Sequence, residues 1–349
     1  YNTGWMVGDI KGAFLSDTTA ESFSATNLVS EDFSSNWTGA TNGVLSVSSG
    51  QLTITNSGGG NGRAQSNTFA TTGGKKYAFI VKAVSNSSAT YRLEVRGPEL
   101  VTEGTTNGQT LVIYFNGTGN SSTFVELYAI GGSGASATYE DAYVVEIEED
   151  RSVNNKGLQV FGTITKSAVA TGADLVAYSG FGASNKLENR SDYDFGAGTS
   201  VSMCIIGWFK TTNISTYTYI MSVYDSGTDH VAGLAINSTS AGGANPAGTL
   251  YVYDSVTAQT SGTILVNDGQ WHCAVGIFDG PTRKIYLDGK LEVSNTYTSY
   301  SLDIVDTDKL TVGRYAYNDD YNFLGSLALT RISKSIPSAE QIKKIYEDE

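Results

Sequence analysis

Hydrophobic and polar residues alternate along most of the chain. Leu52 and Ile54 would point to one side of an extended segment and Thr53 and Thr55 to the other, which is the two-residue period of a half-buried β-strand. Ser49-Gly50, just before this segment, is typical of a hairpin turn. Segments of strand type recur at 44–48, 51–55, 77–83, 90–96, 109–115, 123–129, 143–147, 202–210, 219–224, 231–236, 249–253, 271–278, 283–287, 309–313 and 325–332. Short strands at this spacing predict β-sandwiches.

One segment has a helical period instead. Ser338, with Gln341 three residues later, forms a capping-box pattern, and Ile342, Ile345 and Tyr346 would share one face of the helix that follows. The pattern as a whole therefore predicts an all-β fold: two antiparallel β-sandwich (jelly-roll) domains in tandem, with an N-terminal arm and a short C-terminal helix.

The chain divides into three predicted parts, an N-terminal arm at 1–27, a β-sandwich at 28–150 and a jelly roll at 151–349. An acidic run at 146–150 marks the joint between the last two. The arm has no sustained period, yet it is too apolar for a free linker because it holds Trp5, Met6, Ile10, Phe14 and Leu15. We therefore expect the arm to pack on something else, such as another subunit.

The composition agrees with many short strands joined by polar turns, since the 349 residues include 40 glycines, 21 tyrosines and only 4 prolines. There are 22 Lys and Arg against 35 Asp and Glu, a formal net charge of −13. No basic run appears, so we expect neither nucleic-acid binding nor docking on anionic lipid. No run of 18 apolar residues appears either, which predicts no membrane insertion. The chain starts at Tyr1 without Met or leader, and we expect a fragment or processed part of a longer protein.

Few residues offer catalytic chemistry. Cys204 and Cys273 lie in apolar strand-like runs, either as buried free thiols or as a disulfide across neighbouring strands. His272 fits a hydrogen-bonded structural residue, whereas His230 is either a surface-loop residue or a weak metal ligand. The sequence has no complete paired-carboxylate motif of a jelly-roll glycosidase and no nucleophile elbow. We therefore predict that the protein is not an enzyme and requires no cofactor.

The stretch from Asp268 to Gly289 carries a family resemblance. Asp268-Gly-Gln-Trp-His272 is followed by Phe278-Asp-Gly280 and then by Ile285-Tyr-Leu-Asp-Gly289, an order that resembles the laminin-G-like (concanavalin A-like) jelly-roll family. The Asp-Gly pairs supply the positive-φ positions that hairpin turns need. The resemblance covers roughly 160–349 and implies the jelly-roll fold there. Trp208 and Trp271 lie within apolar strands, and we predict that both belong to the core.

The first half is similar to carbohydrate-binding-module-like sandwiches through Leu28-Val29, Phe33, Trp37 and Lys75-Lys-Tyr-Ala-Phe79. In the arm, the segment 8–17 resembles segments of tailed-bacteriophage structural proteins, in which such arms precede sandwich modules. This resemblance implies a tail or head fibre exposed on the virion. Its partners would be host cell-surface glycans and, through the arm, other virion proteins, and it would be a homo-oligomer, a trimer in a fibre.

Two loops are candidate sites. The loop at 314–322 could stack sugar rings on tyrosines and bind hydroxyls with amide and carboxylate oxygens, or it could be a tyrosine-rich turn packed on its own sandwich; its candidate ligand-binding residues are Tyr315, Tyr317, Asn318, Asp319, Asp320 and Tyr321. Members of the resembling family often hold Ca²⁺ at one rim, and the candidate calcium ligands are Asp303, Asp306 and Asp308. Solvated turn carboxylates are the alternative to a calcium site.

The sequence as a whole indicates a non-enzymatic virion structural and adhesion protein whose lectin-like modules bind host glycans. A secreted or cell-surface bacterial adhesin is one alternative. A polysaccharide-degrading enzyme, or the accessory binding module of such an enzyme, is the other.

Overall fold

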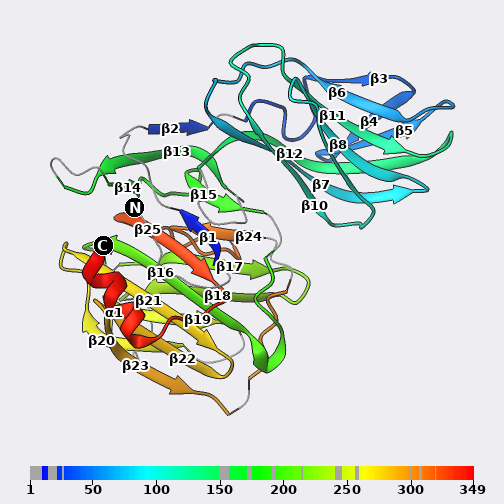
Figure 1. Ribbon diagram of the computed structural model, residues 1–349. Coiled ribbons are helices and arrows are strands. Elements are labelled where there is room, and N and C mark those ends of the chain that lie inside the picture. Colours follow the sequence, from blue (N-terminus) through cyan, green and yellow to red (C-terminus); the bar gives the residue numbers. More distant parts are fainter. Residues whose placement is uncertain are drawn as a thin grey trace. The chain divides into compact units, whose positions relative to one another are not determined.

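The chain forms two compact units, Ala25–Ile147 and Tyr1–Ser24 with Glu148–Glu349, which we call the N-terminal sandwich and the C-terminal jelly roll (Figure 1). The computed structural model describes residues 10–14, 22–25, 27–148, 157–170, 175–190, 193–213, 215–239, 246–255, 259–298, 300–305, 309–318 and 320–349. Strands dominate both units, and the described helices are η1 (Gly198–Ser200) and α1 (Ala339–Asp348). The predicted all-β sandwich fold is confirmed. No helix within these ranges has the length and apolar character needed to cross a membrane.

The N-terminal sandwich has two five-stranded antiparallel sheets. One sheet has the order β3 (Trp37–Ala40), β6 (Gly62–Ser66), β11 (Phe124–Ile130), β8 (Thr90–Arg96) and β9 (Leu100–Gly104). The other has the order β4 (Gly43–Ser48), β5 (Gln51–Asn56), β12 (Ser136–Glu148), β7 (Lys76–Ser87) and β10 (Thr110–Asn116).

Alternate residues of these strands fill the space between the two sheets. Leu52 and Ile54 of β5 are fully buried there, as are Leu93 and Val95 of β8. The turn between β4 and β5 has positive φ at both central residues, Ser49 and Gly50. This is the backbone of a two-residue hairpin, so the predicted turn is confirmed.

The C-terminal jelly roll has a front and a back sheet, which share the long strand β13 (Leu158–Ala168). The front sheet continues from β13 through β15 (Lys186–Asn189), β24 (Lys309–Val312), β17 (Thr218–Asp225), β18 (His230–Ile236), β19 (Thr249–Asp254) and β20 (Thr260–Leu265). The back sheet continues from β13 through β14 (Val176–Ser179), β25 (Ser326–Ser333), β16 (Ser202–Lys210), β21 (Trp271–Asp279), β22 (Thr282–Leu287) and β23 (Lys290–Thr296).

Glycine lets the two sheets of the jelly roll approach each other. A Cβ atom built on Gly276 of β21 would lie 3.1 Å from side-chain atoms of both Leu234 and Val252 on the front sheet. Leu234 and Val252 therefore face inward, and the residues next to them along β18 and β19 face outward. The predicted Asp-Gly turns are also confirmed, because the glycines at 269, 280 and 289 all have positive φ.

Part of the predicted N-terminal arm belongs to this jelly roll. β1 (Ile10–Phe14) pairs antiparallel with the back-sheet strand β25, and β2 (Ser22–Ala25) is also a strand. The expectation that this segment packs on something else, such as another subunit, is therefore wrong for 10–14, because an open edge of β25 offers backbone hydrogen bonds within the same chain. Trp5, Met6 and Leu15 lie outside the described residues.

Helix α1 covers part of the outer face of the back sheet. Ser338 caps it through the predicted box, in which the Ser338 side chain accepts a bond from the Gln341 backbone and Gln341 binds back to Ser338. Ile342 and Ile345 pack on a cluster that includes Cys204 and Cys273, both buried free thiols. Burial raises the pKa of the Cys204 thiol to about 12.

The prediction that Trp208 and Trp271 belong to the core is wrong. Both side chains are only partly buried, and both lie on the outer face of the back sheet. Because α1 covers part of that face, β16 and β21 carry apolar residues on both sides. An apolar strand consequently does not reveal which of its residues face the space between the sheets.

Candidate functional site

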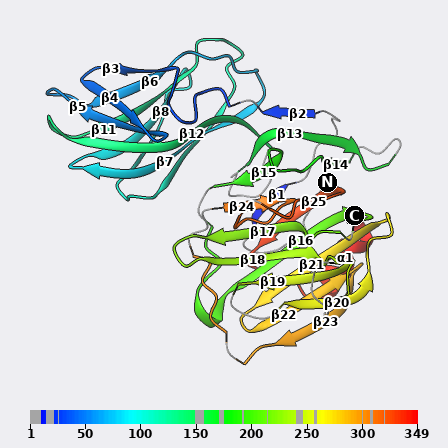
Figure 2. The same ribbon diagram turned by 180° about the vertical axis from the view of Figure 1, so that it is seen from behind.

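Eight tyrosines gather on the outer face of the front sheet, and we call this group the tyrosine face. Figure 2 shows the strands beneath it, β24, β17, β18 and β19, side by side in that order. Each member has its ring centroid within 6.5 Å of another member's centroid: Tyr217, Tyr219, Tyr224, Tyr251, Tyr253, Tyr315, Tyr317 and Tyr321.

Small residues in the middle of the sheet make room for the deepest rings. Ala235 on β18 is the strand partner of Tyr219 on β17 on one side and of Tyr251 on β19 on the other. All three residues are buried. A Cβ atom on Gly233 would lie 3.0 Å from Cδ1 of Tyr219. The sequence thus places a glycine and an alanine on β18 where two neighbouring strands carry large rings.

Buried hydrogen bonds hold the predicted loop at 314–322 against the outer face of the front sheet. The Ser222 hydroxyl donates to the backbone oxygen of Arg314 (2.9 Å) and accepts from the backbone nitrogen of Ala316 (2.8 Å). Thr311 also donates to the Arg314 oxygen, at 2.6 Å. At the far end of the loop, the Tyr219 nitrogen donates to the Tyr321 oxygen at 3.4 Å. The loop is therefore fixed at both ends to β17.

The two interpretations of the loop each hold for different tyrosines. Tyr315 is partly buried, and its centroid lies 4.7 Å from that of Tyr219, so this residue packs on its own sandwich. Tyr317 and Tyr321 keep 47% and 41% of their surface exposed. Asn318 and Asp320 are also exposed. The side-chain oxygen of Asn318 accepts from the Asp320 nitrogen at 3.3 Å, while Asp319 lies outside the described residues.

The surroundings of the deep tyrosines keep their hydroxyls protonated. Burial, together with the neighbouring phenols, raises the pKa of Tyr219, Tyr251 and Tyr315 well above the ordinary tyrosine range. These three side chains are accordingly uncharged at neutral pH, and the tyrosine face presents apolar rings with hydroxyl groups at their edges.

A hairpin adjoining the loop connects the tyrosine face to the predicted calcium region. Tyr224 packs edge-on against Tyr317 at 5.3 Å, and its hydroxyl donates to Asp229 at 3.1 Å. Asp225 accepts from the backbone nitrogens of Gly227 and Val305 at 3.0 and 3.1 Å. The structure therefore brings together the loop, the hairpin at 225–230 and the segment at 303–305.

The described residues of the calcium region serve as hydrogen-bond acceptors for the backbone. Asp303 accepts from the Gly198 nitrogen at 2.6 Å, and its own nitrogen donates to Nδ1 of His230 at 2.8 Å. His230 is the first residue of β18 rather than a loop residue, and this hydrogen bond ties it to the segment at 303–305. Among the residues that the structure describes, no group of three or more His, Cys, Asp or Glu side chains is placed to hold a metal. Asp306 and Asp308 lie outside those residues, and a calcium site there stays a prediction.

His272 has a structural environment, as predicted. Its Nδ1 lies 2.9 Å from Oδ2 of Asp288, and its Nε2 lies 3.3 Å from Oδ1 of Asp268. The hydrogen bond to Asp288 is the main cause that raises the pKa of His272. Asp288 also accepts from the Cys273 nitrogen, so the pair fixes the hairpin turn at the end of β22.

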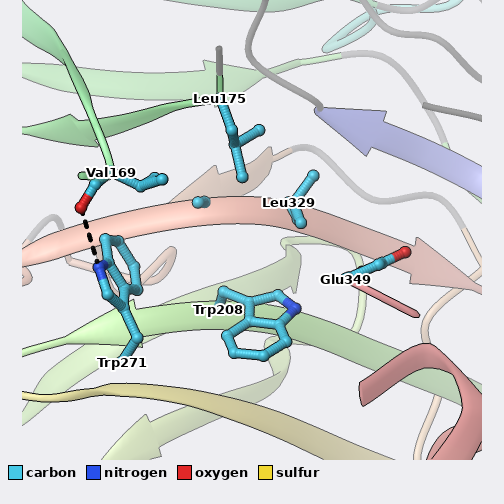
Figure 3. Close-up of a pocket in the computed structure, with 7 residues that line it drawn as sticks. Val169, Leu175, Trp208, Trp271, Leu329 and Glu349 are labelled. Carbon is cyan, nitrogen blue, oxygen red and sulfur yellow. Dashed lines mark hydrogen bonds between the residues drawn. The ribbon is translucent and has the colours of Figure 1, made fainter. Parts of the chain in front are cut away.

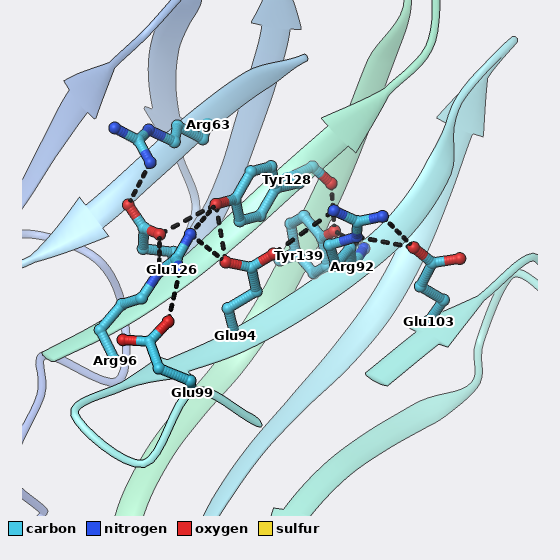
Figure 4. A network of polar contacts seen from close by, with 9 residues as sticks. All are labelled: Arg63, Arg92, Glu94, Arg96, Glu99, Glu103, Glu126, Tyr128 and Tyr139. Atoms are coloured by element: carbon cyan, nitrogen blue, oxygen red, sulfur yellow. Dashed lines mark hydrogen bonds and ion pairs between the residues drawn. The ribbon is translucent and has the colours of Figure 1, made fainter. Parts of the chain in front are cut away.

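The N-terminal sandwich carries a charged network on the outer face of the sheet containing β8 and β11 (Figure 4). The side chain of Glu126 is fully buried and contacts both Arg63 (2.9 Å) and Arg96 (2.7 Å). Arg96 also pairs with Glu94 and Glu99. Since each of these carboxylates is already paired with an arginine, this network is best explained as a structural layer of the sheet.

The tyrosines that β17, β19 and the residue before β17 contribute to the tyrosine face were not predicted from the sequence. Tyr217 and Tyr219 are two residues apart, as are Tyr251 and Tyr253, so each pair lies on one side of its extended segment. That spacing was the available signal. The sequence pattern alone could not show that both pairs face the loop at 314–322, because this depends on the pairing of β17 with β18 and of β18 with β19.

Several solved structures are similar to parts of this chain. The structure is similar to domain 4 of the extracellular GH43 arabinanase AbnA from Geobacillus stearothermophilus, solved with arabinotriose, at 16% identity and a TM-score of 0.44 over 57% of this chain and 92% of that one. It is also similar to the CBM40 of the Ruminococcus gnavus IT-sialidase, at 14% identity and a TM-score of 0.35 over 46% and 98% of the two chains.

A putative carbohydrate binding protein from Bacteroides ovatus is similar over 84% of this chain and 79% of its own, at 13% identity and a TM-score of 0.33. No curated protein matches. Residues 183–343 match the model of the concanavalin A-like lectin/glucanases superfamily. The C-terminal unit therefore contains a concanavalin A-like jelly-roll domain.

Proposed function

We propose that the tyrosine face binds glycans. The observation that carries this proposal is the pair of exposed rings, Tyr317 and Tyr321, held in place by the packed tyrosines beneath them. An apolar ring face can stack on the C–H face of a sugar, while the exposed oxygens of Asn318 and Asp320 can bind its hydroxyls. The superfamily that residues 183–343 match includes lectins by description, which supports the same class of ligand.

Two exposed carboxylates on the rim of the tyrosine face favour neutral sugars. Asp229 and Asp320 are exposed on its rim, whereas Arg314 is buried beneath the loop. A sialic or uronic acid would bring a second negative charge close to these carboxylates, in a chain of net charge −13. A neutral, hydroxyl-rich oligosaccharide avoids this repulsion.

The binding we propose needs no metal. Asp225 and Asp303 use carboxylate oxygens to accept backbone hydrogen bonds, and the tyrosine face makes its contacts through rings, hydroxyls and the loop. Glycan binding is therefore expected to persist after dialysis against a chelator. A loss of binding that added Ca²⁺ restores would assign a calcium role to the adjacent 303–308 segment.

For the role of the whole protein, we propose a non-enzymatic adhesion protein on a virion, in a tail or head fibre. It is supported by the resemblance of the segment 8–17 to phage structural proteins, and it includes other virion proteins as partners. A homo-oligomer, a trimer in a fibre, belongs to the same proposal because weak single-site glycan binding gains from multivalency. A cell-surface adhesin and an accessory module of a polysaccharide-degrading enzyme would use the same face.

An array of neutral and acidic glycans tests the proposed ligand class directly. We expect retention on neutral oligosaccharides and none on their sialylated or uronate counterparts; retention only on acidic glycans would contradict the proposal. Co-sedimentation with particles rather than cells would support the virion location. Release of sugar from a polysaccharide panel by the intact chain would overturn the non-enzymatic assignment.

A further inference from the structure

A group of uncharged polar side chains continues the outer face of the front sheet beyond the tyrosine face. Ser261 on the edge strand β20 is the strand partner of Tyr251, so both side chains point to that face. The alternation along β18 and β19 places two further members there, at positions 237 and 249. Hydrogen bonds join the four members, which we call the amide–hydroxyl cluster: Asn237, Thr249, Gln259 and Ser261.

The hydrogen bonds of this cluster fix the direction of its amide groups. The Thr249 hydroxyl donates to the backbone oxygen of Pro246 at 2.7 Å, so its oxygen accepts from Nδ2 of Asn237 at 3.0 Å. Nδ2 also donates to Oγ of Ser261 at 3.2 Å, and Oδ1 of Asn237 accepts from Nε2 of Gln259. Nε2 of Gln259 donates to Oγ of Ser261 as well, at 3.1 Å. Turning either amide over would set oxygen against oxygen, so both orientations are determined.

This arrangement leaves one acceptor and one donor for a ligand. Both hydrogens of Gln259 Nε2 are used, while its Oε1 has no donor among the described residues and is not sealed from solvent. Ser261 Oγ already accepts from two amides, so its own hydrogen is available to a ligand. Both side chains are partly exposed, whereas Asn237 and Thr249 are buried. Buried partners therefore hold an exposed donor–acceptor pair in place.

The donor–acceptor pair lies on the same continuous surface as the exposed rings of the tyrosine face. The ring centroid of Tyr217 lies 5.6 Å from that of Tyr321 and 5.5 Å from that of Tyr251. Tyr251 in turn is the strand partner of Ser261. From β17 to β20 the surface spans three strand spacings, roughly 14 Å. Because this is longer than one sugar ring, a glycan that contacts both places has to be an oligosaccharide.

The hollow on the outer face of the back sheet lacks such a pair among its described lining residues. Figure 3 shows this hollow, of about 180 Å³, with Trp208 and Trp271 on one side and Leu175 and Leu329 opposite them. Nε1 of Trp271 donates to a backbone oxygen at 3.4 Å, and Nε1 of Trp208 is sealed from solvent. The carboxylate of Glu349 is already in an ion pair. The exposed hydrogen-bonding groups that a sugar needs are therefore on the front sheet.

We propose that Gln259 and Ser261 form a second subsite, which binds one unit of a linear, neutral oligosaccharide while another unit stacks on the exposed rings of the tyrosine face. Two neighbouring sugar hydroxyls satisfy the pair, because one donates to Oε1 of Gln259 and the other accepts from Ser261. The amide–hydroxyl cluster has no ionisable member, in keeping with the neutral ligand of the proposed function, on which this inference rests. Contact at both places makes the affinity increase with the length of the oligosaccharide.

Calorimetry of the full chain with cello-, malto-, laminari- and galacto-oligosaccharides, from the monosaccharide to the hexasaccharide, tests the subsite. Ser261→Ala removes the outward donor and should weaken hexasaccharide binding about tenfold, as expected for one hydrogen bond. The affinity for the shortest sugar that binds should stay unchanged, since it contacts only the exposed rings. Ser261→Thr keeps the hydroxyl and should keep the affinity for every length. Ser294→Ala, on the exposed strand β23, is the matched control and should do the same.

Gln259→Ala removes the outward acceptor and gives a second test if Ser261→Ala fails to show a cooperative thermal melt. Three results would overturn the subsite: an affinity that does not rise with length, an unchanged hexasaccharide affinity in both variants, or equal weakening at every length, which would show a purely structural role. Tyr317→Ala combined with Tyr321→Ala should instead weaken binding at every length. If the wild type binds none of the lengths, the proposed function fails with the subsite, whereas the three results above leave that function intact.

Discussion

The ring of Tyr315 lies on the ring of Tyr219, with centroids 4.7 Å apart and planes 32° apart. One residue belongs to the loop after β24 and the other to β17, so the contact joins a loop to the sheet floor. Because the loop is already ordered, a ligand that binds its exposed residues loses little further conformational entropy from the protein. The tyrosine face is in this sense preorganised.

Ser222 is expected to support that preorganisation. Ser222→Ala removes the donor to the Arg314 oxygen and the acceptor for the Ala316 nitrogen, both of them buried. Because Thr311 still donates to the Arg314 oxygen, the Ala316 nitrogen is the group left unpaired; its loss should lower the free energy of unfolding by about 1–3 kcal/mol and weaken glycan binding. Denaturant unfolding measures the first effect. Ser294→Ala, on the exposed strand β23, is the control and should stay within about 0.5 kcal/mol of the wild type.

Gly233 is expected to be required for the position of Tyr219. In Gly233→Ala the new Cβ would lie 2.9 Å from Cβ of Ser222 and 3.0 Å from Cδ1 of Tyr219, so the ring has to move. Overpacking of this kind should cost about 1–3 kcal/mol in thermal unfolding. Gly182→Ala is the matched control, since a Cβ there meets no atom within 4 Å. Equal melting temperatures of the two variants would contradict the packing described.

Much of the fold, but only part of the candidate site, could be predicted from the sequence. Two-residue alternation, Asp-Gly turns and the capping box at Ser338 are local signals. Each depends only on residues close together in the sequence, and the strands, turns and helix start that they predict are present. The tyrosine face depends on strand pairing across Ala235, which no local pattern encodes. Trp208 was misplaced for a related reason, because the helix that covers the outer face of β16 comes more than a hundred residues later in the chain.

His272 is expected to make the stability of the jelly roll depend on pH. Its pKa in the folded state is raised above the ordinary value of 6.5, mainly through Asp288. A raised pKa means that the folded state favours the protonated imidazole. The stabilisation is therefore complete below pH 6.5 and is lost as the pH rises through the raised pKa.

The difference in unfolding free energy between wild type and His272→Asn, followed from about pH 5 to pH 8, isolates this effect. The difference should be larger at the acidic end and should shrink toward the alkaline end. A difference that grows with pH would contradict the assignment of the His272–Asp288 pair.

Glu126 is expected to be far more important for stability than Glu99, although both contact Arg96. The Glu126 side chain is fully buried, whereas the Glu99 side chain is 63% exposed. Glu126→Gln removes the buried charge that Arg63 and Arg96 share; because both arginines are partly exposed and Arg96 keeps Glu94 and Glu99, the loss of these charged hydrogen bonds should cost about 1.5–3 kcal/mol. Glu99→Gln breaks an exposed, solvent-screened ion pair, and its loss should cost much less. Urea unfolding of the N-terminal sandwich compares the two, and similar costs would show that the network does not behave as a buried layer.

The most direct test of the central claim is the affinity of the full chain for a neutral oligosaccharide selected from the array, measured by calorimetry. Tyr317→Ala with Tyr321→Ala removes the two exposed rings of the tyrosine face, and Tyr114→Ala removes a tyrosine of the N-terminal sandwich as a control. If the tyrosine face is the glycan site, the double variant loses at least about tenfold in affinity, equivalent to about 1.4 kcal/mol, while its melting curve and the control's affinity stay unchanged. Unchanged affinity in a folded double variant would contradict the claim.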